Sequence, residues 1–371
     1  MTLELTAAAS LGAWVYLFTA RGGFWSIKAA PAPPPNPPAK LVCAVIPARN
    51  EKPVAGEAIR SLLHQDYPGR LQVILVDDHS SDRTSAIAAE AGATVVAAGP
   101  LPPGWKGKLW AISEGVKASQ SLEPDFYLFT DADIVHAADN VARLVARAEA
   151  SGLDLVSLMV KLRCRSLAER ALIPAFVYFF FQLYPPSWIS SRRRKTAGAA
   201  GGCILIRPSA LARIGGIAAI RGELIDDCAL ARAVKRSGGG IWLGVTQDTA
   251  SIRDYTSFTE IRRMIARTAF AQLRHSALLL AGTILGMAVI YLAPPMLLFT
   301  GNPLAAASGL AAWIMMTISY LPVLRFYRRS PAWAPLLPLV ALFYMAATLD
   351  SAVRYWTGRG GVWKDRVQDA N

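Results

Sequence analysis

The chain has 371 residues, 53% of them hydrophobic, and a formal net charge of +13. A chain of this length can bury a full core without disulfide staples. Its mean hydropathy of +0.32 is high for a soluble enzyme and predicts membrane-spanning segments. No basic motif with interleaved aromatic residues accompanies the charge. We therefore expect anionic lipid head groups and phosphorylated substrates as partners, and no nucleic acid.

The four cysteines are scattered without a CxxC pair, at Cys43, Cys164, Cys203 and Cys228. This spacing fits neither a zinc site nor a disulfide scaffold and predicts reduced thiols. No partner or charge in the sequence suggests that Cys203 or Cys228 is a nucleophile, so we expect both to be small buried side chains.

An apolar run over residues 3–20 begins the chain, followed by Arg21 and Lys28. Its length, with Glu4 and no basic residue before it, favours a retained transmembrane anchor over residues 1–22 rather than a cleaved signal peptide. The basic residues would then lie on the cytosolic side. The proline-rich residues 23–40 predict a stiff linker.

Residues 41–152 alternate short β-rich runs with helical stretches, which predicts a parallel α/β sheet. Helices are expected at 56–65 and at 81–92, the second capped by Ser81 or Asp82. Ligands gather at the carboxyl ends of strands in such sheets, so this half predicts a nucleotide site. The expected strands are 41–48, 71–78, 93–99 and 126–133.

Further strands are expected at 153–160, 201–208 and 240–246, which complete a domain over residues 41–275. Within it, residues 171–195 combine an aromatic cluster with four consecutive basic residues at 192–195. This combination favours an element in the membrane interface, and a buried helix followed by a solvated loop is the alternative.

After Arg274 the sequence becomes apolar, in three runs that are each about as long as a spanning helix. They predict a membrane region over residues 276–354, before a basic tail over 355–371. Four spans in all would put that tail outside, whereas its charge favours the cytosol, and a re-entrant or interfacial segment would resolve the conflict. The three runs are 277–299, 303–324 and 333–353.

Asp131 and Asp133 end the expected strand 126–133. Alternate residues of a strand share a face, so the two carboxylates would repel each other unless a cation lay between them. Such oxygen ligands suit Mg²⁺ or Mn²⁺, which bridge the phosphates of a nucleotide. The pair therefore predicts a metal site, and a helix cap is the alternative.

Two other expected strand ends carry acids, because Glu51 follows 41–48 while Asp77 and Asp78 close 71–78. Acids from three strand ends at one sheet edge repel each other unless a ligand or cation uses them. By composition, Asp77 or Asp78 can accept hydrogen bonds from a base N–H or a ribose hydroxyl, and Glu51 can do the same.

Six motifs resemble those of the inverting family 2 glycosyltransferases of GT-A fold, in order and rough spacing, over residues 41–274: VIPARNE, VDDHSSDRT, GKLWAISEG, TDAD, GGCILIRP and IDDCALA. The flanking membrane segments, PPGWKGKLWA and the terminal GRGGVWKDR look most like the hopene-associated glycosyltransferases, which are bacterial membrane proteins found with hopanoid synthesis genes. The resemblance implies an α/β, Rossmann-like GT-A domain with transmembrane helices on both sides.

The resemblance also implies residue roles on the donor side. They fall on six positions: Glu51, Asp77 and Asp78 for the nucleotide, Lys108 for the donor phosphates, and Asp131 and Asp133 for the metal and diphosphate.

On the acceptor side, Gly201 and Gly202 match the loop on which the acceptor lies. The family's next motif is usually Glu-Asp, whose Asp is the general base. Here it is Asp226-Asp227, so the base falls on Asp227, while Asp226 departs from the pattern. An acceptor hydroxyl must lose its proton as it attacks the anomeric carbon, which requires such a group. An acidic cap of the following helix is the alternative.

The family's Gln-x-x-Arg-Trp motif is incomplete, because Gln272 and Arg274 are one residue too close and no Trp follows. Either Arg267 or Arg274 would contact the diphosphate, with lipid phosphates as the alternative partner. For His136, three residues after Asp133, we expect a surface position, and a third metal ligand is the alternative.

Together these features predict a membrane-bound inverting glycosyltransferase. It would transfer a sugar from a nucleotide sugar, expected to be UDP-linked, to a hopanoid or polyprenol-like lipid at the cytosolic face of a bacterial inner membrane. The expected cofactor is Mg²⁺ or Mn²⁺. One alternative is a processive polysaccharide synthase, which needs more spans and an intact Gln-x-x-Arg-Trp motif. The other is a non-catalytic scaffold, suggested by Asp226 and the incomplete arginine motif.

Overall fold

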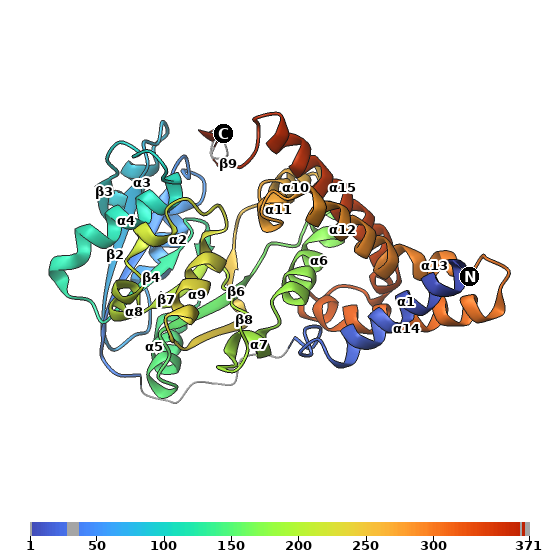
Figure 1. Ribbon diagram of the computed structural model, residues 1–371. Coiled ribbons are helices and arrows are strands. Elements are labelled where there is room, and N and C mark those ends of the chain that lie inside the picture. The colour runs from blue at the N-terminus through green and yellow to red at the C-terminus, as the bar shows by residue number, and fades with distance from the viewer. Residues whose placement is uncertain (1, 28–36, 364–365, 368–371) are drawn as a thin grey trace. The chain divides into compact units, whose positions relative to one another are not determined.

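The computed structural model describes residues 2–27, 37–363 and 366–367, in which the chain forms two compact units (Figure 1). The α/β unit takes the described residues of Lys28–Arg163 and Trp188–Asp254. The helical unit takes those of Met1–Ile27, Cys164–Ser187 and Tyr255–Asn371. Part of the expected domain 41–275 therefore clusters with the membrane helices.

The α/β unit is built on an eight-stranded sheet of order β3-β2-β1-β4-β7-β6-β8-β5 (Figure 1). All seven expected strands are present, and the short β5 pairs with the end of β8. The strands are β1 (Leu41–Ala48), β2 (Arg70–Asp77), β3 (Thr94–Ala97), β4 (Phe126–Thr130), β5 (Ile134–Val135), β6 (Leu155–Lys161), β7 (Cys203–Ile206) and β8 (Ile241–Ser251).

Strands β1 to β4 are parallel, as the sequence predicts. The sheet as a whole is mixed, because β7 runs antiparallel to both β4 and β6. The register pairs Ala48 with Asp77 and Thr130 with Cys203. The carboxyl ends of β1, β2 and β4 and the start of β7 therefore meet at one edge of the sheet, and this arrangement positions the site.

Helices of the α/β unit pack against this sheet, and α4 contacts both β1 and β2. A Cβ at Gly115 of α4 would lie 2.9 Å from Val76 Cγ2, so a glycine is needed for this close approach. Thr84 N, at the start of α3, donates a hydrogen bond to Asp82 Oδ1 at 2.9 Å, so Asp82 satisfies a backbone N–H at the start of this helix. The helices are α2 (Ala55–Leu63), α3 (Thr84–Glu90), α4 (Gly107–Ser119), η1 (Gln120–Leu122), α5 (Asn140–Ala150), α8 (Pro208–Arg213), η2 (Ile217–Ile220) and α9 (Asp226–Arg236), with α7 (Pro186–Ser190) at the unit boundary.

The helical unit contains three helices long and apolar enough to cross a membrane: Ala277–Leu297, Pro303–Phe326 and Pro331–Trp356. They coincide with the three expected runs. Large apolar side chains such as Leu278, Leu304 and Leu339 are exposed on them, as lipid-facing residues would be. The elements of this unit are α1 (Thr2–Thr19), α6 (Leu167–Leu183), α10 (Phe258–Ala266), α11 (Ala269–Gln272), α12 (Ala277–Met287), η3 (Ala288–Leu292), α13 (Ala293–Leu297), α14 (Pro303–Phe326), η4 (Pro331–Leu336), α15 (Leu337–Trp356), β9 (Val362–Trp363) and β10 (Arg366–Val367).

The N-terminal helix α1 is not among the candidate spans, which differs from the anchor expected over residues 1–22. Threonine, serine and Glu4 interrupt its apolar run. One face of α1 is buried, and the Trp14 indole N–H donates to the Ile290 carbonyl at 2.6 Å. The helix therefore packs within the unit. Residues 28–36 of the expected proline-rich linker, and part of the basic tail, lie outside the described residues.

The aromatic segment predicted to be interfacial forms α6, which is largely buried. Ser166 and Glu169 form a capping box at its start, and Tyr178 and Phe181 are buried inside the helical unit. The basic residues 192–195 follow in an exposed loop. The interfacial position of residues 171–195 stays a prediction.

Candidate active site

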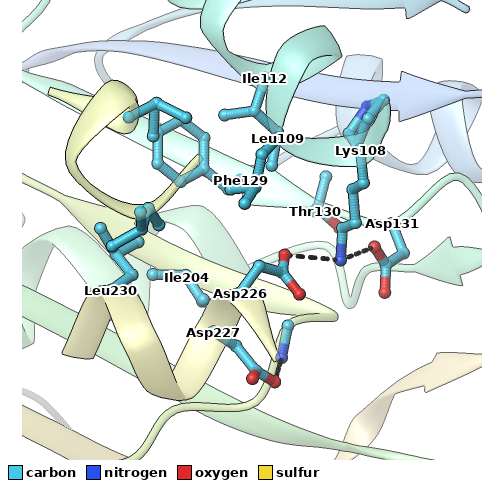
Figure 2. Close-up of a pocket in the computed structure, with 14 residues that line it drawn as sticks. Lys108, Leu109, Ile112, Phe129, Thr130, Asp131, Ile204, Asp226, Asp227 and Leu230 are labelled. Atoms are coloured by element: carbon cyan, nitrogen blue, oxygen red, sulfur yellow. Dashed lines mark hydrogen bonds and ion pairs between the residues drawn. The ribbon is translucent and has the colours of Figure 1, made fainter. Parts of the chain in front are cut away.

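A lysine at the start of α4 joins two acidic motifs. Lys108 Nζ lies 2.8 Å from Asp131 Oδ1, after β4, and 3.1 Å from Asp226 Oδ2, in the first turn of α9 (Figure 2). Burial opposes the lysine charge, but the two aspartates, together with Asp227, outweigh it and hold the pKa of Lys108 above its ordinary value. The ammonium group therefore stays charged and neutralises part of the acidic cluster.

Asp227, the predicted base, accepts two backbone hydrogen bonds. Its Oδ2 accepts from Gly201 N at 2.8 Å and its Oδ1 from Cys228 N at 2.6 Å. Burial and the neighbouring Asp226 raise the pKa of Asp227 to about 6, against the opposing effects of Lys108 and the two N–H groups. The carboxylate is thus ionised at neutral pH yet more basic than an ordinary aspartate.

These charged groups line one side of a pocket of about 330 Å³, part of which is open to solvent. Figure 2 shows Leu109, Phe129 and Leu230 on its apolar side and Asp226 turned toward Lys108, while the dashed line at Asp227 marks its hydrogen bond to a backbone N–H. A pocket with an apolar wall and a few convergent charged groups is the usual form of a small-molecule site. The full lining is Pro47, Lys108, Leu109, Ile112, Phe129, Thr130, Asp131, Gly201, Ile204, Ile217, Ile220, Asp226, Asp227 and Leu230.

The loop before β7 leaves little room for a side chain at the point closest to this cluster. A Cβ on Gly201 would lie 3.3 Å from both Asp227 Oδ2 and Lys108 Nζ. At Gly202 it would instead meet Val160 and Ile134, at 3.1 and 3.2 Å. Gly201 therefore faces the charged groups and Gly202 faces the core, although both were expected to contact the acceptor.

A second cluster forms around Arg253, which the sequence analysis did not single out. Arg253 Nη2 donates to both carboxylate oxygens of Glu51, at 2.7 and 2.8 Å, and its Nε lies 3.4 Å from Asp133 Oδ2. Asp133 Oδ2 also accepts from Ser251 Oγ at 2.5 Å. The available signal in the sequence was a basic residue just beyond a strand. The fold brings this residue back onto Asp133 and onto Glu51, which lies 202 residues away.

The predicted geometry of Asp131 and Asp133 is wrong. Strand β4 ends at Thr130, so both acids lie in the following turn and do not alternate along an extended chain. Each has its own cation, Lys108 for Asp131 and Arg253 for Asp133. Their repulsion is therefore relieved by two separate positive side chains.

The donor set of this turn nevertheless fits a hard divalent cation. Mg²⁺ is usually held by one or two carboxylates, with water and substrate phosphates as its other ligands. Asp131 and Asp133 supply two such carboxylates, and Asp131 is partly exposed. Among the described residues, no group of three His, Cys, Asp or Glu side chains forms a complete protein cage.

Asp77 and Asp78, the two acids expected to bind the nucleotide, differ in what they contact. Asp77 accepts from Ser85 Oγ at 2.6 Å and from Ser80 N at 3.1 Å, so its carboxylate holds the loop after β2. Asp78 is fully buried, 3.2 Å from His79 Nδ1 and 4.0 Å from Arg49 Nη1. Both lie at the sheet edge where β1, β2 and β4 end.

His136 is buried, which corrects the expectation of a surface histidine. Its ring nitrogens lie 2.9 Å from Thr130 Oγ1 and from Asn140 Nδ2. Burial lowers the pKa of His136 to about 3.

Cys203 and Cys228, which were expected to be buried, are both buried, and burial raises the pKa of Cys203 to about 12.

Arg267 and Arg274 belong to the helical unit, at the end of α10 and after α11. Arg274 has a φ of 53°, in the left-handed region. Their expected contact with a diphosphate stays a prediction.

Comparison with known proteins identifies the domain around this site. Residues 43–215 match the family model described as Glycosyl transferase family 2. The chain is 35% identical over 118 residues to the 4,4'-diaponeurosporenoate glycosyltransferase of Staphylococcus haemolyticus, covering 30% of each protein. It is 47% identical over 51 residues to the beta-monoglucosyldiacylglycerol synthase of a Synechocystis species, covering 14% of this chain and 11% of that one. The matches thus span less than a third of either relative.

A solved structure resembles the whole chain. The mannosyltransferase PcManGT from Pyrobaculum calidifontis, in complex with GDP-Man and Mn²⁺, superposes with a TM-score of 0.55 and 18% identity, over 98% of this chain and 100% of that one. At this identity the likeness establishes the fold. The mixed sheet and this superposition show a GT-A fold, within which residues 43–215 match the glycosyl transferase family 2 model.

Proposed function

We propose that this chain is a membrane-bound inverting glycosyltransferase, which transfers a sugar from a nucleotide-sugar donor to a lipid acceptor. Three candidate spans support the membrane location. The names of two relatives, a diaponeurosporenoate glycosyltransferase and a glucosyldiacylglycerol synthase, support a hydrophobic acceptor. We propose a hopanoid or polyprenol-like lipid, glycosylated at the cytosolic face of a bacterial inner membrane.

The position of Asp227 is the observation that carries this proposal. A general base must be ionised at the working pH and must still hold a proton well enough to take it from a hydroxyl. Asp227 lines the pocket beside Lys108, and its pKa is raised to about 6 by burial and by Asp226. Its two backbone hydrogen bonds fix the carboxylate in place.

The reaction then follows from the side chains of the pocket. The acceptor oxygen forms a bond to the anomeric carbon while its proton passes to the Asp227 carboxylate. The bond from that carbon to the diphosphate oxygen breaks, and its electron pair leaves with the diphosphate. Attack opposite the leaving group inverts the anomeric centre. Lys108 places a fixed positive charge in the same pocket, where negative charge develops on the leaving group.

The other predicted residues complete the donor side of the proposal. Asp131 and Asp133 would hold Mg²⁺ or Mn²⁺, which supplies positive charge for the diphosphate when bound. The acids Glu51, Asp77 and Asp78 are proposed for the nucleotide. The GDP-Man and Mn²⁺ of PcManGT support this kind of donor and cofactor, without fixing the base or sugar. Further proposed contacts are Arg267 or Arg274 with the diphosphate, and Gly201, Gly202 and Asp226 with the acceptor.

Transfer of radiolabel tests the function directly. The full chain, reconstituted in lipid nanodiscs with Mn²⁺ and a bacterial lipid extract, should move label from one member of a panel of UDP- and GDP-sugars into the organic phase. Asp227→Asn should lower kcat about a thousandfold, because the amide cannot accept the proton. Asp248→Asn, at an exposed acid outside the pocket, is the matched control.

Other outcomes would replace this function. Unchanged transfer in Asp227→Asn would contradict the base, and a ladder of long polymers would identify a processive synthase. Calorimetry that detected neither nucleotide nor Mn²⁺ binding would favour a non-catalytic scaffold.

A further inference from the structure

A continuous chain of hydrogen bonds crosses the core behind the pocket. Asn140 Nδ2, at the start of α5, lies 2.9 Å from His136 Nδ1. His136 Nε2 lies 2.9 Å from Thr130 Oγ1, at the end of β4. Thr130 Oγ1 donates to the Gly202 carbonyl at 2.8 Å. Asn140, His136 and Thr130 are all at least 95% buried, so solvent does not compete for these bonds.

The donor and acceptor roles along this series of hydrogen bonds fix the tautomer of His136. The Thr130 hydroxyl has one proton, which it gives to the Gly202 carbonyl, so it must accept a proton from His136 Nε2. Nδ1 is then the acceptor, which the amide N–H of Asn140 satisfies. A protonated ring would turn an N–H toward that amide N–H. Only the neutral tautomer with hydrogen on Nε2 satisfies every group.

This series of hydrogen bonds ends on the loop before β7, which holds the proposed base, Asp227. On one side of Gly201, Ala200 N donates to Ser157 Oγ at 2.9 Å. On the other side, the Gly202 carbonyl is held by Thr130. Between these two anchors, Gly201 N donates to Asp227 Oδ2 at 2.8 Å. The orientation of this N–H therefore depends on where its two neighbours are held.

We propose that His136 is a positioning residue for Asp227, acting through Thr130 and the Gly202 carbonyl to aim the Gly201 N–H at the base. The inference rests on the proposed role of Asp227. A neutral histidine is suited to it, because the ring is rigid and supplies one donor and one acceptor at fixed positions. Burial keeps the pKa of His136 near 3, so it holds this tautomer at every pH at which the enzyme would work.

Three variants separate positioning from simple packing. His136→Leu removes both ring contacts, whereas His136→Gln keeps an N–H donor for Thr130. Thr130→Val keeps the volume of Thr130 and the whole of His136 and removes only the hydroxyl. We expect His136→Leu and Thr130→Val to lower kcat about tenfold with donor KM within about twofold, and His136→Gln to recover most of the loss.

The pH profile of kcat distinguishes positioning from packing, because a packing defect alone would not shift its acidic limb. The Gly201 N–H lowers the pKa of Asp227, so a misaimed N–H should shift the acidic limb of kcat upward by about half a pH unit. The same shift should be seen without turnover, in the infrared band of the protonated carboxyl that disappears in Asp227→Asn. Because this titration needs no turnover, it tests the positioning role of His136 independently of the proposed function. The proposed function fails separately if Asp227→Asn retains transfer.

Two results would overturn the proposal. One is a wild-type kcat and a wild-type acidic limb in a folded His136→Leu or Thr130→Val. The other is a His136→Gln variant no better than His136→Leu. If His136→Leu does not fold, Thr130→Val alone decides the question, since it leaves the buried ring in place.

Discussion

Two regions of the α/β unit each gather acids around a single cation. In the lysine cluster, Lys108 contacts Asp131 and Asp226. In the arginine cluster, Arg253 contacts Glu51 and Asp133. Asp131 and Asp133 are separated by one residue, yet the turn after β4 sends them to different cations. The two clusters therefore contain the same kinds of charged groups but occupy two neighbouring places.

The two cations differ in what they can do. Lysine is a compact point charge whose donors can turn to a new partner, and Lys108 lines the pocket together with Asp227, the proposed base. Arginine presents a planar, permanently charged fork, and Arg253 ties the end of β8 to the loop after β1 and the turn after β4. The lysine cluster thus lies where the proposed chemistry would take place, and the arginine cluster holds three segments together.

Removing the lysine should have the largest effect in this comparison. Lys108→Met leaves Asp131 and Asp226 without their shared cation and removes a charge that lowers the pKa of Asp227. We expect kcat to fall about a hundredfold and the acidic limb of its pH profile to move upward. Steady-state transfer assays across pH measure both. Lys117→Met, on the exposed side of α4, is the control, and transfer within threefold of wild type in Lys108→Met would refute the role.

A methyl group at Gly201 should disturb the same cluster more mildly. In Gly201→Ala the new Cβ would lie 3.3 Å from Asp227 Oδ2 and from Lys108 Nζ, closer than most Cβ contacts. We expect about a tenfold loss of kcat with little change in melting temperature. In Gly202→Ala the nearest neighbours of the new Cβ are Val160 and Ile134 in the core. It should instead lower the melting temperature, and equal kcat losses in the two variants would contradict the distinction.

The sequence predicts well the part of the site that depends on parallel strands. Long apolar runs identify β1, β2 and β4, and parallel strands end at the same sheet edge. Local pattern alone therefore places the acids after these strands at the correct edge of the sheet, although it does not give the geometry of Asp131 and Asp133. Asp227 in the first turn of α9 was found through the resemblance, and the backbone donors that hold it could not be read from the side-chain sequence.

Contacts that depend on turns and on distant chain segments could not be predicted. Alternation along a strand says nothing of Asp131 and Asp133 once β4 ends at Thr130. His136 was expected on the surface but is buried, although a polar ring is costly to bury alone. Its burial requires Asn140 and Thr130 on different elements, and no periodicity encodes their meeting. The mixed sheet has the same origin, since the direction of β7 depends on pairing with β4 and β6.

Breaking the arginine cluster should change binding more than chemistry. Arg253→Gln removes the charge that Glu51 and Asp133 share and loosens the loops that carry them. We expect about a fivefold rise in donor KM with kcat within twofold, because Asp227 and Lys108 keep their contacts. Initial-rate kinetics at varied donor concentration separates the two constants. Arg143→Gln, whose acidic partners are exposed, is the control, and a kcat loss as large as that of Lys108→Met would erase the difference between the clusters.

The pH dependence of the unmutated enzyme tests the same comparison without a substitution. The pKa of the Asp227 carboxyl is raised from 3.8 to about 6, so the group is ionised and able to accept a proton above that pH, and protonated below it. We expect kcat to be level above pH 7, to fall to about half near pH 6, and to drop about tenfold for each further pH unit. Arg253 is not among the groups that shift this pKa. The limb should therefore stay in place in Arg253→Gln and move upward in Lys108→Met, because only the lysine cluster shares its electrostatic field with the base.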